Sequence, residues 1–157
     1  MSPVAGMARS LNLAMEDQEK DNWCWAAVSV SVRKFYGMAG PRSQCGQAEG
    51  QFHRPCCADP DSCDQRWILD PNIFTRSAGT FPFVTVQQQI DAGRLVTARI
   101  TWAEGGTHYV CIDGYNIAGP EPLVSVKDPF YGPSTIPYNR LVAGYLDRGS
   151  WTESYRS

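Results

Sequence analysis

Apolar and polar positions along the chain follow two different periods, and the change of period separates predicted helices from predicted strands. In NWCWAAVSVSVRKFYG, Val28, Val32 and Phe35 recur at helical spacing, with Asn22 as N-cap and Gly37 as C-cap. The run from Val28 to Val32 also alternates with a period of two, which is typical of a strand. The two alanines before this run and the caps at both ends favour a helix.

Shorter patterns predict two further helices and four strands. Ser43 can cap a helix that continues to about Gln51, and Thr85 can cap VQQQIDAG, which Gly93 ends. The strand-like runs are Leu95 to Trp102, His108 to Tyr115, Leu123 to Lys127 and Trp151 to Tyr155. Helices come early and strands late, and this order predicts an α+β fold with an antiparallel sheet in the second half.

The length of 157 residues fits one domain, which we place at 15–157. Residues 1–14 show no clear period and begin with Ser, Pro and Gly, so we expect a loose N-terminal lead-in. The net charge of −2 and the lack of a Lys/Arg cluster argue against a nucleic-acid partner. No apolar run approaches the ~18 residues of a membrane span, and MSPVAGMARSLNL lacks the regions of a signal peptide. We expect a monomer without membrane contact.

Four of the six cysteines, Cys45, Cys56, Cys57 and Cys63, gather in one segment of nineteen residues. No CxxC pair is present, which favours two disulfides over zinc, while His53 keeps a zinc site with these cysteines as the alternative. Neighbouring cysteines rarely bond each other, so Cys56 and Cys57 should each reach to Cys45 or Cys63. Disulfides predict an oxidising compartment outside the producing cell. The protein would then be a mature form or leave by a route without a recognisable signal peptide; otherwise the thiols stay reduced.

The two remaining cysteines and the two histidines supply the candidate chemistry. Cys24 lies near the start of the first predicted helix, where free backbone N–H groups and the helix dipole favour a thiolate. A nucleophilic cysteine normally needs an imidazole as base, and His108 follows two glycines at the start of a predicted strand. The simpler interpretation is that Cys24 is a small buried side chain and His108 an ordinary strand residue.

A glutamine and one of two rival aspartates complete the candidate site. Gln18 lies six residues before Cys24, close enough for its amide to help the Cys24 backbone N–H stabilise an oxyanion. Asp128 and Asp113 are rival groups for orienting His108. Side chains alternate along a strand, so His108 should share a face with Val110 and Ile112, opposite to Cys111 and Asp113. This parity favours Asp128 as the orienting residue and makes Cys111 a buried structural thiol.

These segments together resemble papain-like cysteine peptidases. Gln18 with NWCWAAVS resembles the nucleophile segment, GGTHYVCIDGY the histidine strand, and LVSVKDPFYG the strand that ends in the third catalytic residue. The chain is most similar to a compact bacterial branch that includes secreted effector proteases of plant-associated bacteria, from Gln18 to GSWTESY. Asp128 stands where plant papains have Asn, and the chain is much shorter than theirs.

The resemblance implies a two-lobed fold, with a helical lobe carrying Cys24, a sheet lobe carrying His108 and Asp128, and a protein or peptide substrate in the cleft between them. Trp23, Trp25 and Trp102 are candidates for core packing or cleft wall, with the core expected for Trp25. The same chemistry would serve an amidase, isopeptidase or acyl-transfer enzyme. A non-catalytic binding module held together by cysteines is the alternative from another class. We expect no cofactor and no metal ion in the reaction.

Overall fold

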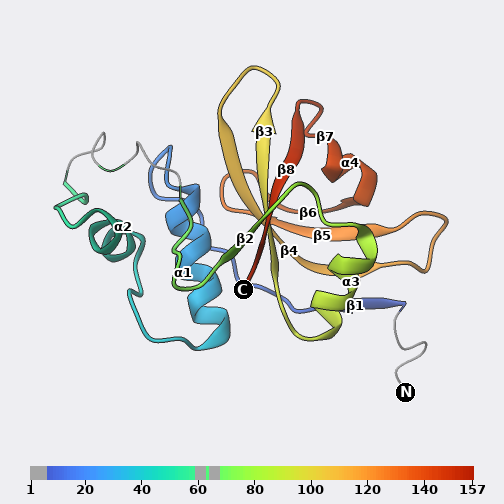
Figure 1. The fold of residues 1–157 in the computed structure, drawn as a ribbon, viewed down its shortest axis with the longest axis horizontal. Coiled ribbons are helices and arrows are strands. Elements are labelled where there is room, and N and C mark those ends of the chain that lie inside the picture. Colours follow the sequence, from blue (N-terminus) through green and yellow to red (C-terminus); the bar gives the residue numbers. More distant parts are fainter. Residues whose placement is uncertain (1–6, 59–62, 64–67) are drawn as a thin grey trace.

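The computed structural model describes residues 7–58, 63 and 68–157 (Figure 1). The elements in chain order are β1 (Ala8–Ser10), α1 (Cys24–Tyr36), α2 (Gln44–Phe52), β2 (Thr75–Ala78), α3 (Phe83–Asp91), β3 (Val96–Trp102), β4 (Thr107–Asn116), β5 (Leu123–Asp128), β6 (Gly132–Pro137), α4 (Tyr138–Val142), β7 (Ala143–Tyr145) and β8 (Gly149–Arg156). The strands form one antiparallel sheet in the order β2-β8-β3-β4-β5-β6, with β1 paired to β4 and β7 to β8. The predicted α+β class with an antiparallel sheet is therefore confirmed.

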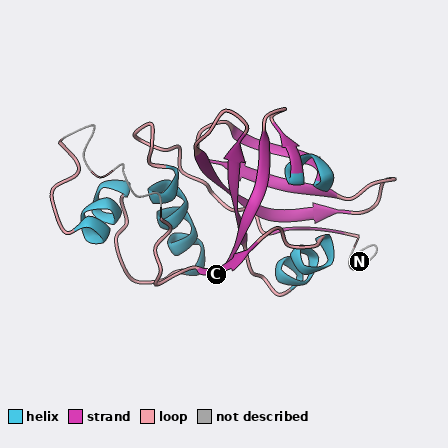
Figure 2. Ribbon diagram, turned by 45° about the horizontal axis from the view of Figure 1, so that its top comes forward, coloured by secondary structure: helices cyan, strands magenta, loops and turns pink. Residues whose placement is uncertain are grey.

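Helices cover both faces of the sheet, so the sheet separates two hydrophobic clusters. Tyr109 and Cys111 of β4 pack with α1 in one cluster, while Val110 and Ile112 pack with α3 and α4 in the other. Figures 1 and 2 show α1 and α2 together beside the sheet, with α3 and α4 at the far side of its strands. The alternation along β4 follows the predicted parity, and His108 has the same parity as Val110.

Helix α1 is buried on nearly every side up to Arg33. The hydroxyls of Ser29 and Ser31 accept hydrogen bonds from the backbone N–H groups of Asp70 and Glu16, at 3.2 and 2.9 Å. Arg33 forms a buried ion pair with Asp70 at 2.6 Å. The alternating valines and serines therefore belong to a helix with neighbours all around it. Its serines bind the backbone of those neighbours, which explains the strand-like period in the sequence.

The helix ends match the sequence patterns only in part. Gly37 is the C-cap of α1, with a left-handed φ of 66°, and Ser43 caps α2 through a hydrogen bond to its hydroxyl. At the other end of α1 the N-cap is Trp23 and not Asn22. Helix α3 starts at Phe83 after Pro82, so the prediction of a start at Thr85 was wrong. Proline fixes its φ near the helical value and suits a helix start without a capping side chain.

The sequence patterns also missed strands at the margins of the sheet. Residues 8–10 pair with β4 and Leu13 is buried in a core cluster, so the expected loose lead-in is wrong for these residues. Residues 1–6 lie outside the described part of the chain. Strand β6 begins at Gly132 and contains Pro133 and Pro137, and its place at one end of the sheet order explains why it tolerates them.

Candidate active site

The candidate nucleophile and base line one cavity of about 410 Å³. Cys24 is the first residue of α1, and Gln18 lies in the segment that leads into it. His108 is the second residue of β4, and Trp102 ends β3 on the other side of the same hairpin. The structure thus brings together the start of α1 and the β3–β4 hairpin, as the sequence predicted for Cys24, Gln18 and His108.

His108 and Asp128 are joined directly. The Nε2 atom of His108 lies 2.8 Å from Oδ1 of Asp128, the last residue of β5, and both side chains are almost completely buried. Because Nε2 faces Asp128, Nδ1 is the ring nitrogen left for the hydrogen bond between His108 and Cys24. The predicted choice of Asp128 as the partner of His108 agrees with this contact.

The Asp128 carboxylate is held by three further hydrogen bonds. Its Oδ1 accepts the backbone N–H groups of Phe130 and Tyr131, at 2.7 and 2.9 Å. Its Oδ2 accepts the hydroxyl of Tyr145 at 2.6 Å. Burial opposes the charged form, yet the hydrogen bond and charge of His108, together with these donors, lower the pKa of Asp128. The carboxylate is therefore fixed in place and ionised.

The charges around His108 favour its protonated form. Burial lowers the pKa of the ring, but the hydrogen bonds and charges of Asp128 and Cys24 outweigh it and raise that pKa to about 9. Cys24 is the first residue of α1, and no side chain caps the first turn of this helix. The site therefore favours the imidazolium form of His108.

Gln18 lies beside Cys24 in the cavity, but its amide group is already engaged. Its Nε2 donates to the backbone carbonyls of Lys20 and Asp21, at 3.0 and 2.6 Å, while its backbone N–H donates to the carbonyl of Pro129 at 2.8 Å. The two carbonyls fix which end of the amide is nitrogen. Gln18 could therefore bind an oxyanion only after one of the hydrogen bonds from its Nε2 to these carbonyls breaks.

Asp113, the rival orienting residue, lies on the other face of β4. Its Oδ2 accepts the ammonium group of Lys127 at 2.5 Å and the backbone N–H of Leu13 at 2.9 Å. The backbone N–H of Leu11 donates to the Asp113 carbonyl at 2.7 Å. These bonds tie the segment before Gln18 to β4 and β5, so Asp113 fixes the chain that enters the site and does not contact His108.

Aromatic side chains enclose the histidine. The ring of Trp102 stacks with His108 at a centroid distance of 5.8 Å, and Tyr131 meets the same imidazole edge-on at 6.1 Å. The guanidinium of Arg148 lies 4.2 Å from the centre of Trp102 and donates to the hydroxyl of Tyr131 at 2.6 Å. Trp102 is thus a wall of the cavity.

The other candidate residues belong to the core. Trp23 and Trp25 are almost fully buried, as expected for Trp25. Cys111 is a free, fully buried thiol beside Thr97, and burial raises its pKa to about 12. It is therefore a structural thiol, as the strand parity predicted. Cys24 is the other free cysteine, and it is the one that lines the cavity.

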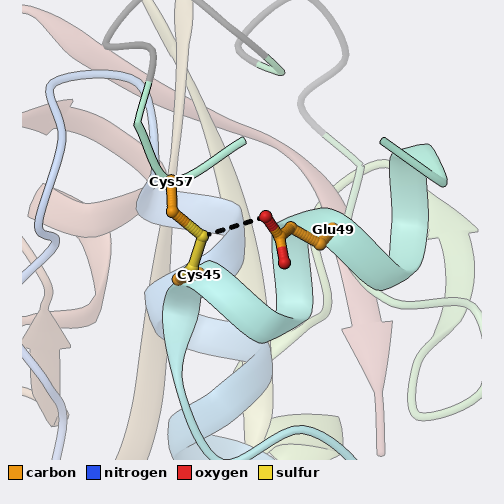
Figure 3. A group of neighbouring side chains, drawn as sticks. All are labelled: Cys45, Glu49 and Cys57. Atoms are coloured by element: carbon orange, nitrogen blue, oxygen red, sulfur yellow. Dashed lines mark hydrogen bonds between the residues drawn. A yellow bond between two sulfur atoms is a disulfide. The ribbon is translucent and has the colours of Figure 1, made fainter. Parts of the chain in front are cut away.

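The clustered cysteines form two disulfides, as predicted, and the structure pairs Cys45 with Cys57 and Cys56 with Cys63. Within the described residues, one group of side chains has the spacing of metal ligands, namely Cys45, Glu49 and Cys57 (Figure 3). Its two sulfur atoms are bonded to each other, so neither is a thiolate ligand. His53 is the C-cap of α2 and is not part of this group. The arrangement favours the disulfide prediction over the zinc alternative.

Sequence patterns did not identify Tyr145, Tyr131 or Arg148 as neighbours of the site. Tyr145 lies 17 residues after Asp128 on β7, and Arg148 follows in the turn to β8. No local period relates these residues to His108. The sequence signal near these residues was the turn DPFYGP, which begins at Asp128. The backbone N–H groups of Phe130 and Tyr131 in this turn donate to Oδ1 of Asp128.

None of the helices in the described ranges is long and apolar enough to cross a membrane. Comparison of the chain with protein-family models and with curated proteins finds no match.

Proposed function

We propose that the protein is a papain-like cysteine peptidase with Cys24 as nucleophile, His108 as general acid and base, and Asp128 as the group that orients His108. The observation that carries the proposal is the contact of His108 Nε2 with the buried Asp128, which directs the other ring nitrogen to Cys24 in a shared cavity. The resemblance of the three segments to papain-like peptidases supports the same assignment. In this proposal α1 and α2 form one lobe, and the sheet with α3 and α4 forms the other.

The reaction begins when the Cys24 thiolate attacks the carbonyl carbon of a peptide bond. The resulting oxyanion is stabilised by the backbone N–H of Cys24 and by the amide of Gln18, once one of its bonds to Lys20 or Asp21 is released. The intermediate collapses as the C–N bond breaks and His108 gives its Nδ1 proton to the leaving amine. A thioester on Cys24 remains.

Water completes the cycle. Neutral His108 removes a proton from a water molecule, which attacks the thioester carbonyl, and the C–S bond breaks to release a carboxylic acid. Throughout the cycle Asp128 stays ionised and keeps the Nε2 proton of His108 in place. The substrate is a protein or a peptide, and the chain acts as a monomer without a nucleic-acid partner.

The two disulfides suggest where the enzyme works. Disulfides persist in oxidising compartments and are rare in the cytosol. We therefore propose that the protein is secreted or delivered outside the producing cell, as the resemblance to bacterial effector proteases also implies. Both bridges lie in the segment around α2, close to the start of the catalytic helix: Lys20 donates to the carbonyls of Cys56 and Cys57, at 3.3 and 3.1 Å.

The test is hydrolysis of a mixed protein substrate, with new N-termini identified by mass spectrometry. Cys24→Ala and His108→Ala should abolish cleavage, while Asp128→Ala leaves a weak enzyme. Cys111→Ala is the matched control because it removes the other free thiol, which lies outside the cavity, and it should keep full cleavage.

The alternatives give different results in the same experiment. An isopeptidase, amidase or acyl-transfer enzyme would depend on Cys24 but yield no new N-termini from unmodified proteins. A non-catalytic module would show no Cys24-dependent product of any kind. Iodoacetamide labelling near neutral pH separates this last case, since a thiolate at Cys24 reacts faster than the buried thiol of Cys111.

A further inference from the structure

We infer that Tyr145 is a positioning residue of the same site, which holds the Asp128 carboxylate in the orientation that His108 requires. The inference rests on the proposed function. It adds a fourth side chain to the three assigned above, and its role is to act through Asp128 without contact with the substrate.

The first argument is the distribution of donors around the carboxylate. Oδ1 of Asp128 receives His108 Nε2 and two backbone N–H groups, while Oδ2 receives only the Tyr145 hydroxyl among the bonds described. Rotation about the Cβ–Cγ bond moves both oxygens of the carboxylate together, so a donor on Oδ2 resists the same rotation as the donors on Oδ1. The bond from Tyr145 fixes the second oxygen, and with it the direction in which Oδ1 faces His108.

The second argument is that Tyr145 is itself fixed. Its side chain is buried, with 2% exposure, and its ring stacks with Trp102 at a centroid distance of 6.1 Å. Trp102 also stacks with His108. The indole of Trp102 therefore contacts both rings that bind Asp128, those of Tyr145 and His108, and it holds them in position beside the carboxylate.

The third argument concerns charge. Oδ2 of Asp128 is buried, and a buried carboxylate oxygen without a donor is costly. The hydroxyl of Tyr145 lowers the pKa of Asp128, although burial and the interactions with His108 have larger effects. Tyr145 thus helps to keep the charge on Asp128 and the proton on His108, which is the distribution that the proposed reaction needs.

Tyr145→Phe tests the inference because it removes one oxygen atom and keeps the ring on Trp102. The matched control is Tyr138→Phe. This variant loses a hydroxyl that donates to the Phe81 carbonyl and has no hydrogen bond to Asp128 among those described. We expect kcat to fall about 10-fold in Tyr145→Phe with little change in KM, as for a lost hydrogen bond to a charged group. Tyr138→Phe should keep the wild-type kcat.

A double-mutant cycle shows whether Tyr145 acts through Asp128. In an Asp128→Ala background, Tyr145→Phe should change kcat less than twofold. Equal losses in both backgrounds, or an unchanged kcat in the single variant, would overturn the inference and leave Tyr145 with a packing role only.

A readout without turnover separates this inference from the proposed function. The chain has two histidines, so NMR signals of the His108 ring can be followed with His53 as an internal reference. We expect the titration of His108 to move to lower pH in Tyr145→Phe, because a carboxylate that turns away supports the imidazolium less. An unchanged or higher midpoint contradicts the inference even where the enzyme is active. A wild-type protein that cleaves nothing contradicts the proposed function and leaves this titration measurable.

Discussion

Replacement of Asp128 by asparagine should lower the pH at which His108 loses its proton and the charged Cys24–His108 pair is lost. The amide keeps the size of the side chain but not its charge, so the imidazolium loses the negative charge that lies 2.8 Å from Nε2. In the wild-type protein the pKa of His108 is raised to about 9. In Asp128→Asn we expect it to fall to near the ordinary value of about 6.5, or below it.

The size of the effect follows from the site. A pKa of about 9 against an ordinary value of 6.5 corresponds to about 3 kcal/mol in favour of the imidazolium. Burial of the ring acts against this, so the attraction of Asp128 and Cys24 must exceed that figure. Asp128 contributes the largest favourable interaction, and its removal leaves Cys24 to offset the burial of His108 alone.

The assay compares alkylation of Cys24 by iodoacetate and by iodoacetamide between pH 5 and 10. The negatively charged iodoacetate is attracted by the imidazolium, so its rate relative to that of neutral iodoacetamide falls as His108 loses its proton. That fall should occur near pH 9 in the wild-type protein and about 2.5 pH units lower, or lower still, in Asp128→Asn. Asp113→Asn is the control, because it neutralises a buried carboxylate of the same strands that does not contact His108.

The reasoning is refuted if the iodoacetate rate of Asp128→Asn still falls near pH 9, because Asp128 would then not set the charge of His108. It is also refuted if Asp113→Asn shows the larger change, which would identify Asp113 as the orienting residue.

Three further outcomes are expected. Gln18→Ala should lower kcat by ~10²–10³ with little change in melting temperature, and unchanged turnover would exclude an oxyanion role. Intact-mass analysis of denatured protein should show two blockable thiols, Cys24 and Cys111, before reduction and six after it, whereas six before reduction or stoichiometric zinc would contradict the disulfides. Because folding raises the pKa of His108, its contribution to the free energy of unfolding should be complete below pH 6.5 and lost as the pH rises through about 9, and urea titrations at constant ionic strength should show this loss in the wild-type protein but not in His108→Gln.

The sequence predicted those features that depend on neighbours along the chain. The helix around Cys24 and the long central strands follow from local periods and caps, and the parity of β4 placed His108 and Cys111 on opposite faces. Strand β6 was missed because its prolines are typical of turns, and only its place at one end of the sheet order makes them acceptable.

Contacts between distant segments could not be predicted in this way. The bond from Tyr145 to Asp128 depends on how β7, which pairs with β8, brings the Tyr145 hydroxyl to the end of β5, and no pattern in either segment records that packing. The bonds of Gln18 to the Lys20 and Asp21 carbonyls are local, but they depend on the exact turn before α1. Sequence spacing placed Gln18 near Cys24 and could not show how its amide is engaged.

The start of α1 shows why one simple rule failed at this site. Asn22 is a favoured N-cap residue, yet the helix begins one position later, after Trp23, and no side chain caps it. A good cap contributes about 1 kcal/mol, which α1 does without because burial on nearly every side stabilises it. The backbone N–H of Cys24, which the proposed reaction uses for the oxyanion, lies in this uncapped first turn. The absence of a capping side chain is therefore a local cost at the helix end that carries the proposed nucleophile, and departures from local rules are expected at functional sites.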